Sequence, residues 1–311
     1  MSRVASQRKS DGTRMRFGLW MINAGIWSQP ELAAQLVSAA EATGFDSLWV
    51  GDHVAMPATH DSAYPYSPDG SVPVPADFAF SDPLIHLAWL SERTSSMLLG
   101  TAVLLLSVRS PIITAKQVAS LDRITGGRVA LGVGQGWLRK EFEMLTNGQW
   151  STRMARLEEG INVMRALWSD DPATFSGEFT RFADVHCLPQ PIRQGGPPIF
   201  ISGSTVVAAR RAGRLGDGYL PMATTPDETA HLVAEARRTA EEHGRDPAAI
   251  EVTYCAPPNP TDYTDPAAAL TADSVDAYAA AGVTRIILAP PVIDLASMES
   301  NLREFLQTVN H

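Results

Sequence analysis

The chain has 311 residues, which is enough for one large α/β barrel or two ordinary domains. Its formal net charge is −9 and no lysine- and arginine-rich run offsets it, which argues against nucleic acid or an anionic membrane as partner and favours a small molecule. Cys187 and Cys255 are the two cysteines, without a C-x-x-C pair or clustered histidines, so we expect no disulfide framework, no metal site and a reducing cytoplasm.

Residues 1–13 are polar and lack the apolar segment of a signal peptide, so we expect a disordered leader and then one domain over 14–311. No later stretch has the length and apolar character of a membrane span. From Arg14 onward, short apolar runs alternate with amphipathic helical stretches. The predicted strands cover 15–22, 45–50, 97–104, 128–133, 198–202, 217–221, 250–255 and 284–288. The predicted helices cover 29–42, 82–95, 111–124, 152–168, 204–214, 227–243, 270–281 and 295–308.

This alternation predicts a TIM (β/α)₈ barrel, because eight β/α units over about 300 residues are typical of that fold. An open doubly wound sheet also alternates, but it needs no eighth unit, and its glycine fingerprint is missing after the first strand. We expect long insertions after strands 2 and 4, at 54–80 and 172–198. Each is either a cover for a pocket or a surface loop on a rigid barrel.

The second predicted strand ends in two titratable residues. Residues 44–53 read G-F-D-S-L-W-V-G-D-H, so an apolar strand leads directly to Asp52 and His53. In parallel α/β proteins the C-terminal ends of the strands carry the chemistry. His53 is therefore a candidate catalytic residue, although a lone histidine is often structural. Further along, Asp82 is expected to be a helix cap, and Arg109 either meets an anion or lies in a solvated loop.

Two later strand ends are suited to a phosphorylated or flat ligand. Strand four runs into G-V-G-Q-G-W at 132–137, where glycines let the backbone approach a ligand and Trp137 offers a ring for stacking. Strand five runs into Ser202, Gly203 and Ser204 before a helix whose free N–H groups suit a phosphate. Hydroxyls at that place also serve as helix caps, and the two uses are compatible. Together these features indicate a phosphorylated cofactor at the barrel rim.

Five runs, W-V-G-D-H, G-T-A-V-L-L-L with R-S-P, S-L-D-R-I-T-G-G-R-V-A-L-G-V-G-Q-G-W-L-R-K-E-F, P-P-I-F-I-S-G-S and R-L-G-D-G-Y-L-P, resemble the bacterial luciferase-like flavin and deazaflavin oxidoreductases. The resemblance covers roughly residues 15–290 in order, and it is nearest to the coenzyme F420-dependent branch of actinobacteria. It implies a TIM barrel, F420 as cofactor with FMN as the alternative, and a homodimer.

The resemblance also implies roles at matching positions. His53 would lie by the reactive face of the cofactor and move the proton that accompanies hydride transfer. The implied cofactor contacts are Asp52; Thr101, Ala102 and Val103 along the ring, often with a non-prolyl cis peptide; Gln135, Gly136 and Trp137 beside the ring or ribityl chain; and Ser202, Gly203 and Ser204 at the phosphate.

The cofactor decides the reaction class. F420 implies hydride transfer, FMN implies oxygen insertion, and a catalytically silent flavin-binding barrel is the third alternative. F420-dependent glucose-6-phosphate dehydrogenases carry a glutamate where this chain has Trp137, and no convincing set of lysines and arginines for a sugar phosphate is evident. This departure from the family pattern argues against a sugar phosphate as substrate and favours an apolar or aromatic carbonyl, alcohol or enone.

Overall fold

The computed structural model describes residues 14–67, 69–72, 74–256, 270–291 and 294–309. The predicted leader, residues 1–13, lies outside these residues. Within them, parallel strands close a barrel in the order β1-β10-β9-β8-β7-β4-β3-β2, and β2 pairs again with β1. The strands are β1 (Arg16–Trp20), β2 (Ser47–Val50), β3 (Leu98–Leu105), β4 (Val129–Gly134), β7 (Ile199–Ser202), β8 (Gly218–Leu220), β9 (Glu251–Cys255) and β10 (Arg285–Leu288). The predicted (β/α)₈ barrel is confirmed.

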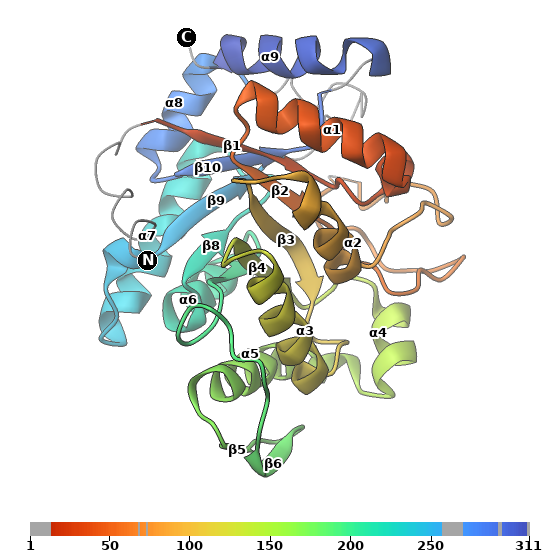
Figure 1. Ribbon diagram of the computed structural model, residues 1–311. Coiled ribbons are helices and arrows are strands. Elements are labelled where there is room, and N and C mark those ends of the chain that lie inside the picture. The colour runs from red at the N-terminus through yellow and green to blue at the C-terminus, as the bar shows by residue number, and fades with distance from the viewer. Residues whose placement is uncertain (1–13, 68, 73, 257–269, 292–293, 310–311) are drawn as a thin grey trace, which may run out of the picture.

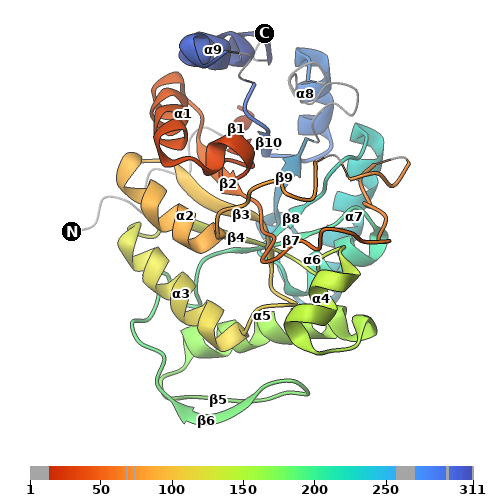
Figure 2. The same ribbon diagram turned by 90° about the vertical axis from the view of Figure 1, so that its right-hand side faces the viewer.

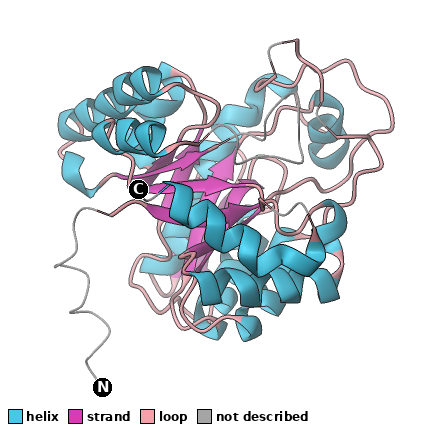
Figure 3. Ribbon diagram, turned by 90° about the horizontal axis from the view of Figure 1, so that it is seen from above, coloured by secondary structure: helices cyan, strands magenta, loops and turns pink. Residues whose placement is uncertain are grey.

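Helices surround the strands on the outside (Figure 3). They are α1 (Pro30–Thr43), α2 (Pro83–Leu90), α3 (Pro111–Ile124), α5 (Arg153–Ser169), α6 (Val206–Leu215), α7 (Pro226–Glu242), α8 (Ala272–Ala280) and α9 (Met298–Val309). Their ends follow local chemistry: Gly44, with φ 101°, ends α1, and Asp82 caps α2 by accepting from the N–H groups of Leu84 and Ile85. Among the described helices, none is both long and apolar enough to cross a membrane.

The core has two layers, one between strands and helices and one inside the barrel. Large rings fill the interior: Trp49 and Phe200 meet edge to face, with ring centroids 5.9 Å apart. Glycines lie opposite them, because a Cβ at Gly100 would fall inside the Trp49 ring and one at Gly218 inside the Phe200 ring. The interior is therefore packed, as expected for a TIM barrel, and a ligand has to bind at the end of the strands.

The N-terminal end of the barrel is closed by ion pairs. Arg285, at the start of β10, is 3% exposed and contacts the carboxylates of Asp46 and Glu251. Burial raises the pKa of Glu251, but Arg285 and Arg16 outweigh burial and lower it. Charges at this end stabilise the fold, which leaves the opposite end for chemistry.

Two parts of the chain differ from the predicted elements. A helix, α4 (Arg139–Thr146), lies in the connection after β4, where no helix was predicted. A hairpin, β5 (Ala173–Ser176) with β6 (Arg181–Val185), occupies the second long connection, which follows α5 and leads into β7.

The hairpin packs on the outer face of α5. Glu159 of α5 accepts hydrogen bonds from the N–H groups of Glu178 and Phe179, and α5 lies between the hairpin and the barrel (Figures 1 and 2). This placement supports the surface-loop interpretation of 172–198. The first connection, 54–80, instead passes in front of the strands in Figure 2.

Candidate active site

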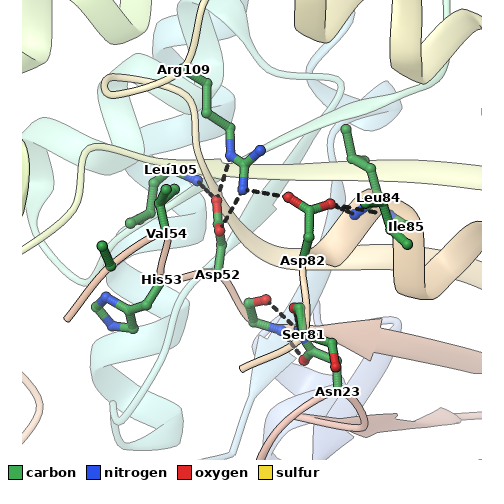
Figure 4. Close-up of polar contacts among 12 residues, drawn as sticks. Asn23, Asp52, His53, Val54, Ser81, Asp82, Leu84, Ile85, Leu105 and Arg109 are labelled. Atoms are coloured by element: carbon green, nitrogen blue, oxygen red, sulfur yellow. Dashed lines mark hydrogen bonds and ion pairs between the residues drawn. The ribbon is translucent and has the colours of Figure 1, made fainter. Parts of the chain in front are cut away.

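The buried side chain of Asn23 holds together the two ends of the connection between β2 and α2. The Asn23 side-chain NH₂ donates to the carbonyls of Gly51 (2.9 Å) and Ser81 (2.7 Å), and its oxygen accepts from the Gly51 N–H at 2.9 Å. Asn23 is 0% exposed, so water does not compete for these bonds. Figure 4 shows this clamp below Asp52. It fixes where the two residues after Gly51 lie.

Asp52 points away from solvent into an ionic network. Its carboxylate receives a bidentate contact from Arg109, Nε to Oδ2 at 2.9 Å and Nη2 to Oδ1 at 2.8 Å, and accepts from the Leu105 N–H at 2.9 Å. The Asp52 side chain is 0% exposed. Burial lowers the pKa of Arg109, but Asp52 and Asp82 outweigh burial and raise it. Arg109 is therefore not a solvated loop arginine: it pairs with two carboxylates and joins the segments after β2 and β3 to the start of α2.

His53 points to the other side of the chain from Asp52 (Figure 4). Its Nδ1 lies 2.8 Å from Oε2 of Glu141, in the first turn of α4. The other oxygen of Glu141 accepts from the N–H groups of Val54 (2.7 Å) and Ala55 (3.1 Å), and its side chain is 2% exposed. A carboxylate partner at Nδ1 selects the tautomer with hydrogen on Nδ1. Nε2 makes no hydrogen bond within the described part of the chain, and it is the nitrogen able to accept a proton.

The C-terminal half of β3 carries an irregularity. The Ala102–Val103 peptide is cis, and the register against β4 shifts between Thr101 and Leu104. The expected non-prolyl cis peptide is therefore confirmed. Trp20 Nε1 donates to the Ala102 carbonyl at 2.6 Å and holds the bulge from inside the barrel. Thr101 is 0% exposed, and its hydroxyl donates to the Gly132 carbonyl at 2.7 Å. This bond ties β3 to β4 directly before the bulge.

The end of β4 lies beside this bulge. A Cβ at Gly134 would come within 2.6 Å of Val103 Cγ2, so glycine here lets β4 approach the bulge closely. Gln135, Gly136 and Trp137 follow, all partly exposed. The Trp137 ring meets the His53 ring edge on at 5.8 Å, which joins the ends of β2 and β4.

At the β7–α6 junction several polar groups already have partners. The Gly203 N–H donates to the Leu220 carbonyl at 3.2 Å, and the Ser204 hydroxyl donates to the Met222 carbonyl and accepts from its N–H. Thr205 is the N-cap of α6, as its side chain accepts from the Ala208 N–H. The first two N–H groups of α6 have no acceptor within the helix.

Ser202, at the same junction, shares a hydrogen bond with Tyr66 from the 54–80 connection. Burial raises the pKa of the Tyr66 phenol despite this bond, so the phenol stays protonated. Tyr66 packs against the interior cluster that includes Ala102 and Phe200. The first long connection therefore reaches the mouth of the barrel, in agreement with its interpretation as a cover for a pocket.

The structure brings the predicted residues to one end of the barrel, and it adds others that sequence patterns did not single out. Glu141 is the main omission: it lay inside the quoted motif R-K-E-F, and an acidic residue in the first turn of a helix would have been a detectable signal. Asn23 had no such signal. A direct contact between Asp52 and a cofactor stays a prediction; its carboxylate is engaged by Arg109 and the Leu105 N–H.

The chain is similar to known proteins both in sequence and in fold. A sequence model of the family described as luciferase-like monooxygenase matches residues 15–301. An uncharacterized protein of Mycobacterium tuberculosis is 30% identical over 283 residues, which is 89% of this chain and 92% of that protein. The F420-dependent glucose-6-phosphate dehydrogenase of Mycolicibacterium fortuitum is 34% identical over 228 residues, 70% of this chain and 61% of that protein.

Solved structures show the same fold. An F420-dependent secondary alcohol dehydrogenase, in complex with an F420-acetone adduct, aligns with a TM-score of 0.76 at 20% identity over 96% of this chain and 99% of its own. A monooxygenase from Streptomyces bottropensis aligns with a TM-score of 0.73 at 21% identity over 95% and 99%. At such identities these likenesses concern the fold alone.

Proposed function

Because this chain belongs to the luciferase-like monooxygenase family, we propose that it is a coenzyme F420-dependent oxidoreductase that transfers a hydride between the deazaflavin and a small organic carbonyl, alcohol or enone. The observation that carries the proposal is the pair formed by His53 and Glu141, which orients a proton acceptor at the functional end of the barrel. The F420-dependent dehydrogenase among the curated relatives supports the choice of cofactor.

The residues at the barrel mouth fit a flat, phosphorylated cofactor. The Ala102–Val103 bulge and Gly134 offer an apolar surface without a projecting side chain from β4. At the other side, the Ser202 hydroxyl, which also contacts Tyr66, and the first two N–H groups of α6, which have no acceptor within the helix, suit a phosphate. The Ser204 hydroxyl is engaged with Met222, so Ser204 would contribute only after giving up that contact.

When bound, a deazaflavin supplies a carbon that accepts or donates hydride and does not form the oxygen adduct of a reduced flavin. His53 Nε2 takes the proton of a substrate hydroxyl during oxidation and returns it during reduction. Glu141 keeps the ring in the required tautomer and stabilises the imidazolium while His53 holds the proton. Asp52 acts as a positioning residue, because its ion pair with Arg109 and its bond to the Leu105 N–H join the end of β2 to the bulge strand.

The cofactor choice is tested by titrating purified, cofactor-free protein with F420 and with FMN while the ligand fluorescence is followed. We expect F420 to bind at least tenfold more tightly, a difference of about 1.4 kcal/mol. Equal affinities, or a protein that purifies yellow with FMN, would contradict the proposal and favour a monooxygenase.

Two finer expectations stay predictions. The resemblance to the family predicts a homodimer, and the cysteine content predicts a cytoplasmic location. Analytical ultracentrifugation of the purified protein measures the first.

A further inference from the structure

A groove on the outside of the barrel, here called the arginine groove, lies between α6 and α7, which pack side by side (Figures 1 and 2). It has a volume of about 600 Å³, which is within the range of small-molecule sites. Its lining includes Val207, Arg210, Arg211 and Arg214 of α6 and Arg238 of α7. Both helices begin at the barrel mouth and run away from it, and the arginines lie from the middle of each helix onward. The groove is therefore separate from the candidate active site.

Glu158 of α5 fixes two of these arginines. Its carboxylate accepts from Arg211 Nε at 2.7 Å and from Arg214 Nη2 at 2.9 Å and 3.0 Å. Burial raises the pKa of Glu158, but Arg211 and Arg214 outweigh burial and lower it. The carboxylate therefore stays ionised and holds both guanidinium groups in place before a ligand arrives, which lowers the entropic cost of binding.

The side chain of Arg211 gives the clearest indication of a ligand. It lines the groove although it is only 8% exposed, and its bond to Glu158 uses Nε alone. Neither Nη1 nor Nη2 donates a hydrogen bond within the part of the chain that the structure describes. Because a guanidinium group that is largely removed from water is costly unless its donors find acceptors, an acceptor in the groove would be favourable.

The other side of the groove also has donors to spare. Glu235 of α7 accepts from Arg210 Nε at 3.0 Å and from Arg238 Nη2 at 2.9 Å, and Glu242 accepts from Arg238 Nη1. Among the described residues, the two Nη groups of Arg210 have no acceptor. The ion pairs of the groove, as far as the chain is described, join four guanidinium groups to three carboxylates. The groove therefore has an excess of positive charge on a chain whose net charge is −9.

Two more features suit an anion that carries an organic group. The N–H groups of residues 243–245 donate to carbonyls of residues 239–241 at 2.9–3.2 Å, so the carbonyls at the end of α7 that would repel an anion already have partners. Val207, at the α6 side of the groove, is 63% exposed. It offers an apolar contact next to the charged groups.

From this geometry we propose that the arginine groove binds a phosphate monoester of a small organic molecule. The Nη groups of Arg210 and Arg211 donate to the phosphate oxygens, because a planar guanidinium matches the geometry of a phosphate. The organic group packs against Val207 and occupies volume that inorganic phosphate would leave to water. The proposal concerns a second site and does not depend on the cofactor or on the reaction proposed above.

Isothermal titration calorimetry of the purified protein tests the proposal. Phenyl phosphate is the monoester probe, inorganic phosphate is the anion without an organic group, and phenol is the ring without a charge. Arg210→Gln removes one fork of donors, and Arg303→Gln is its matched control, because the two side chains are 54% and 52% exposed and each pairs with one glutamate. Arg211→Lys keeps the charge beside Glu158 but removes the planar fork. Gly203→Val separates the groove from the proposed phosphate turn at the barrel mouth.

We expect one phenyl phosphate to bind per chain, at least fivefold more tightly than inorganic phosphate, with no measurable binding of phenol. Arg210→Gln and Arg211→Lys should each weaken phenyl phosphate binding about tenfold, the loss of a hydrogen bond to a charged group, while their thermal unfolding still shows a folded protein. Arg303→Gln and Gly203→Val should change it less than twofold.

Three results would overturn the proposal. Absence of phenyl phosphate binding would remove the site. Binding that Gly203→Val weakens, but Arg210→Gln and Arg211→Lys do not, would place the anion at the barrel mouth instead. Equal affinity for phenyl phosphate and inorganic phosphate would exclude a monoester as the preferred ligand.

Discussion

Replacing Arg109 with methionine should destabilise the protein, because it leaves a carboxylate buried without its counter-charge. Asp52 receives two hydrogen bonds from Arg109, at 2.9 Å and 2.8 Å, and its side chain is 0% exposed. Loss of one partner of a buried ion pair typically costs about 3–5 kcal/mol. The second contact of Arg109, to Asp82, adds little, since the Asp82 side chain is 35% exposed. The Arg109 side chain is itself 14% exposed, so we expect a loss of about 3 kcal/mol, at the lower end of that range.

Equilibrium unfolding in urea measures this loss, and in a thermal scan it should correspond to a drop in Tm of about 5 °C for a chain of 311 residues. Arg303→Met is the matched control, since Arg303 pairs with Glu299 while their side chains are 52% and 58% exposed. That control should change stability by less than about 0.5 kcal/mol. Asp52→Asn combined with Arg109→Met should recover part of the loss, as the orphaned charge is removed. A loss below about 1 kcal/mol for Arg109→Met alone would refute the reasoning from burial.

Three further predictions concern separate parts of the molecule. Glu141→Gln should lower turnover about 10–100-fold with F420 affinity unchanged, and a rate equal to that of the unchanged chain would remove Glu141 from the mechanism. Burial raises the pKa of Glu41, but hydrogen bonds from residues 94–96 outweigh burial and lower it from 4.5 to about 2. The ionised Glu41 carboxylate therefore stabilises the folded state fully above pH 4.5, and this stabilisation is lost as the pH falls toward 2. In urea unfolding, Glu41→Gln should lower the free energy of unfolding by about 1–2 kcal/mol at pH 7, after allowance for solvent screening, and by almost nothing near pH 2. Gly203→Val should weaken cofactor binding, because φ is +136° there and a Cβ would lie 2.8 Å from the Ala208 side chain; unchanged affinity in a folded variant excludes this junction from the cofactor site.

The barrel was predictable because its signals are local. Each strand is a short apolar run next to an amphipathic helix, and marks such as Gly44 and Asp82 fix helix ends through backbone chemistry that involves few residues. The same reasoning located His53, because a residue directly after a strand in a parallel barrel must lie at its C-terminal end. The cis peptide at Ala102 was expected from the family resemblance and not from any local signal.

Which side chains pair with these residues was not predictable, because the partners come from distant parts of the chain. Glu141 lies 88 positions after His53, and its helix is short and strongly polar, so the apolar pattern did not reveal it. Arg109 lies 57 positions after Asp52, and nothing in a loop arginine distinguishes a buried pair from a solvated charge. Such pairings depend on how strands are ordered around the barrel, which the pattern of a single strand does not contain.

The central claim is that His53 moves the proton that accompanies hydride transfer, and single-turnover kinetics of His53→Ala test it most directly. Protein loaded with F420 is mixed with a secondary alcohol, and the loss of F420 absorbance is recorded, with His231→Ala on the exposed face of α7 as control. We predict F420 affinity within a few-fold of the unchanged chain, a hydride-transfer rate lower by about 10²–10⁴ in His53→Ala, and a normal rate in the control. A near-normal rate in a well-folded His53→Ala variant would contradict the claim.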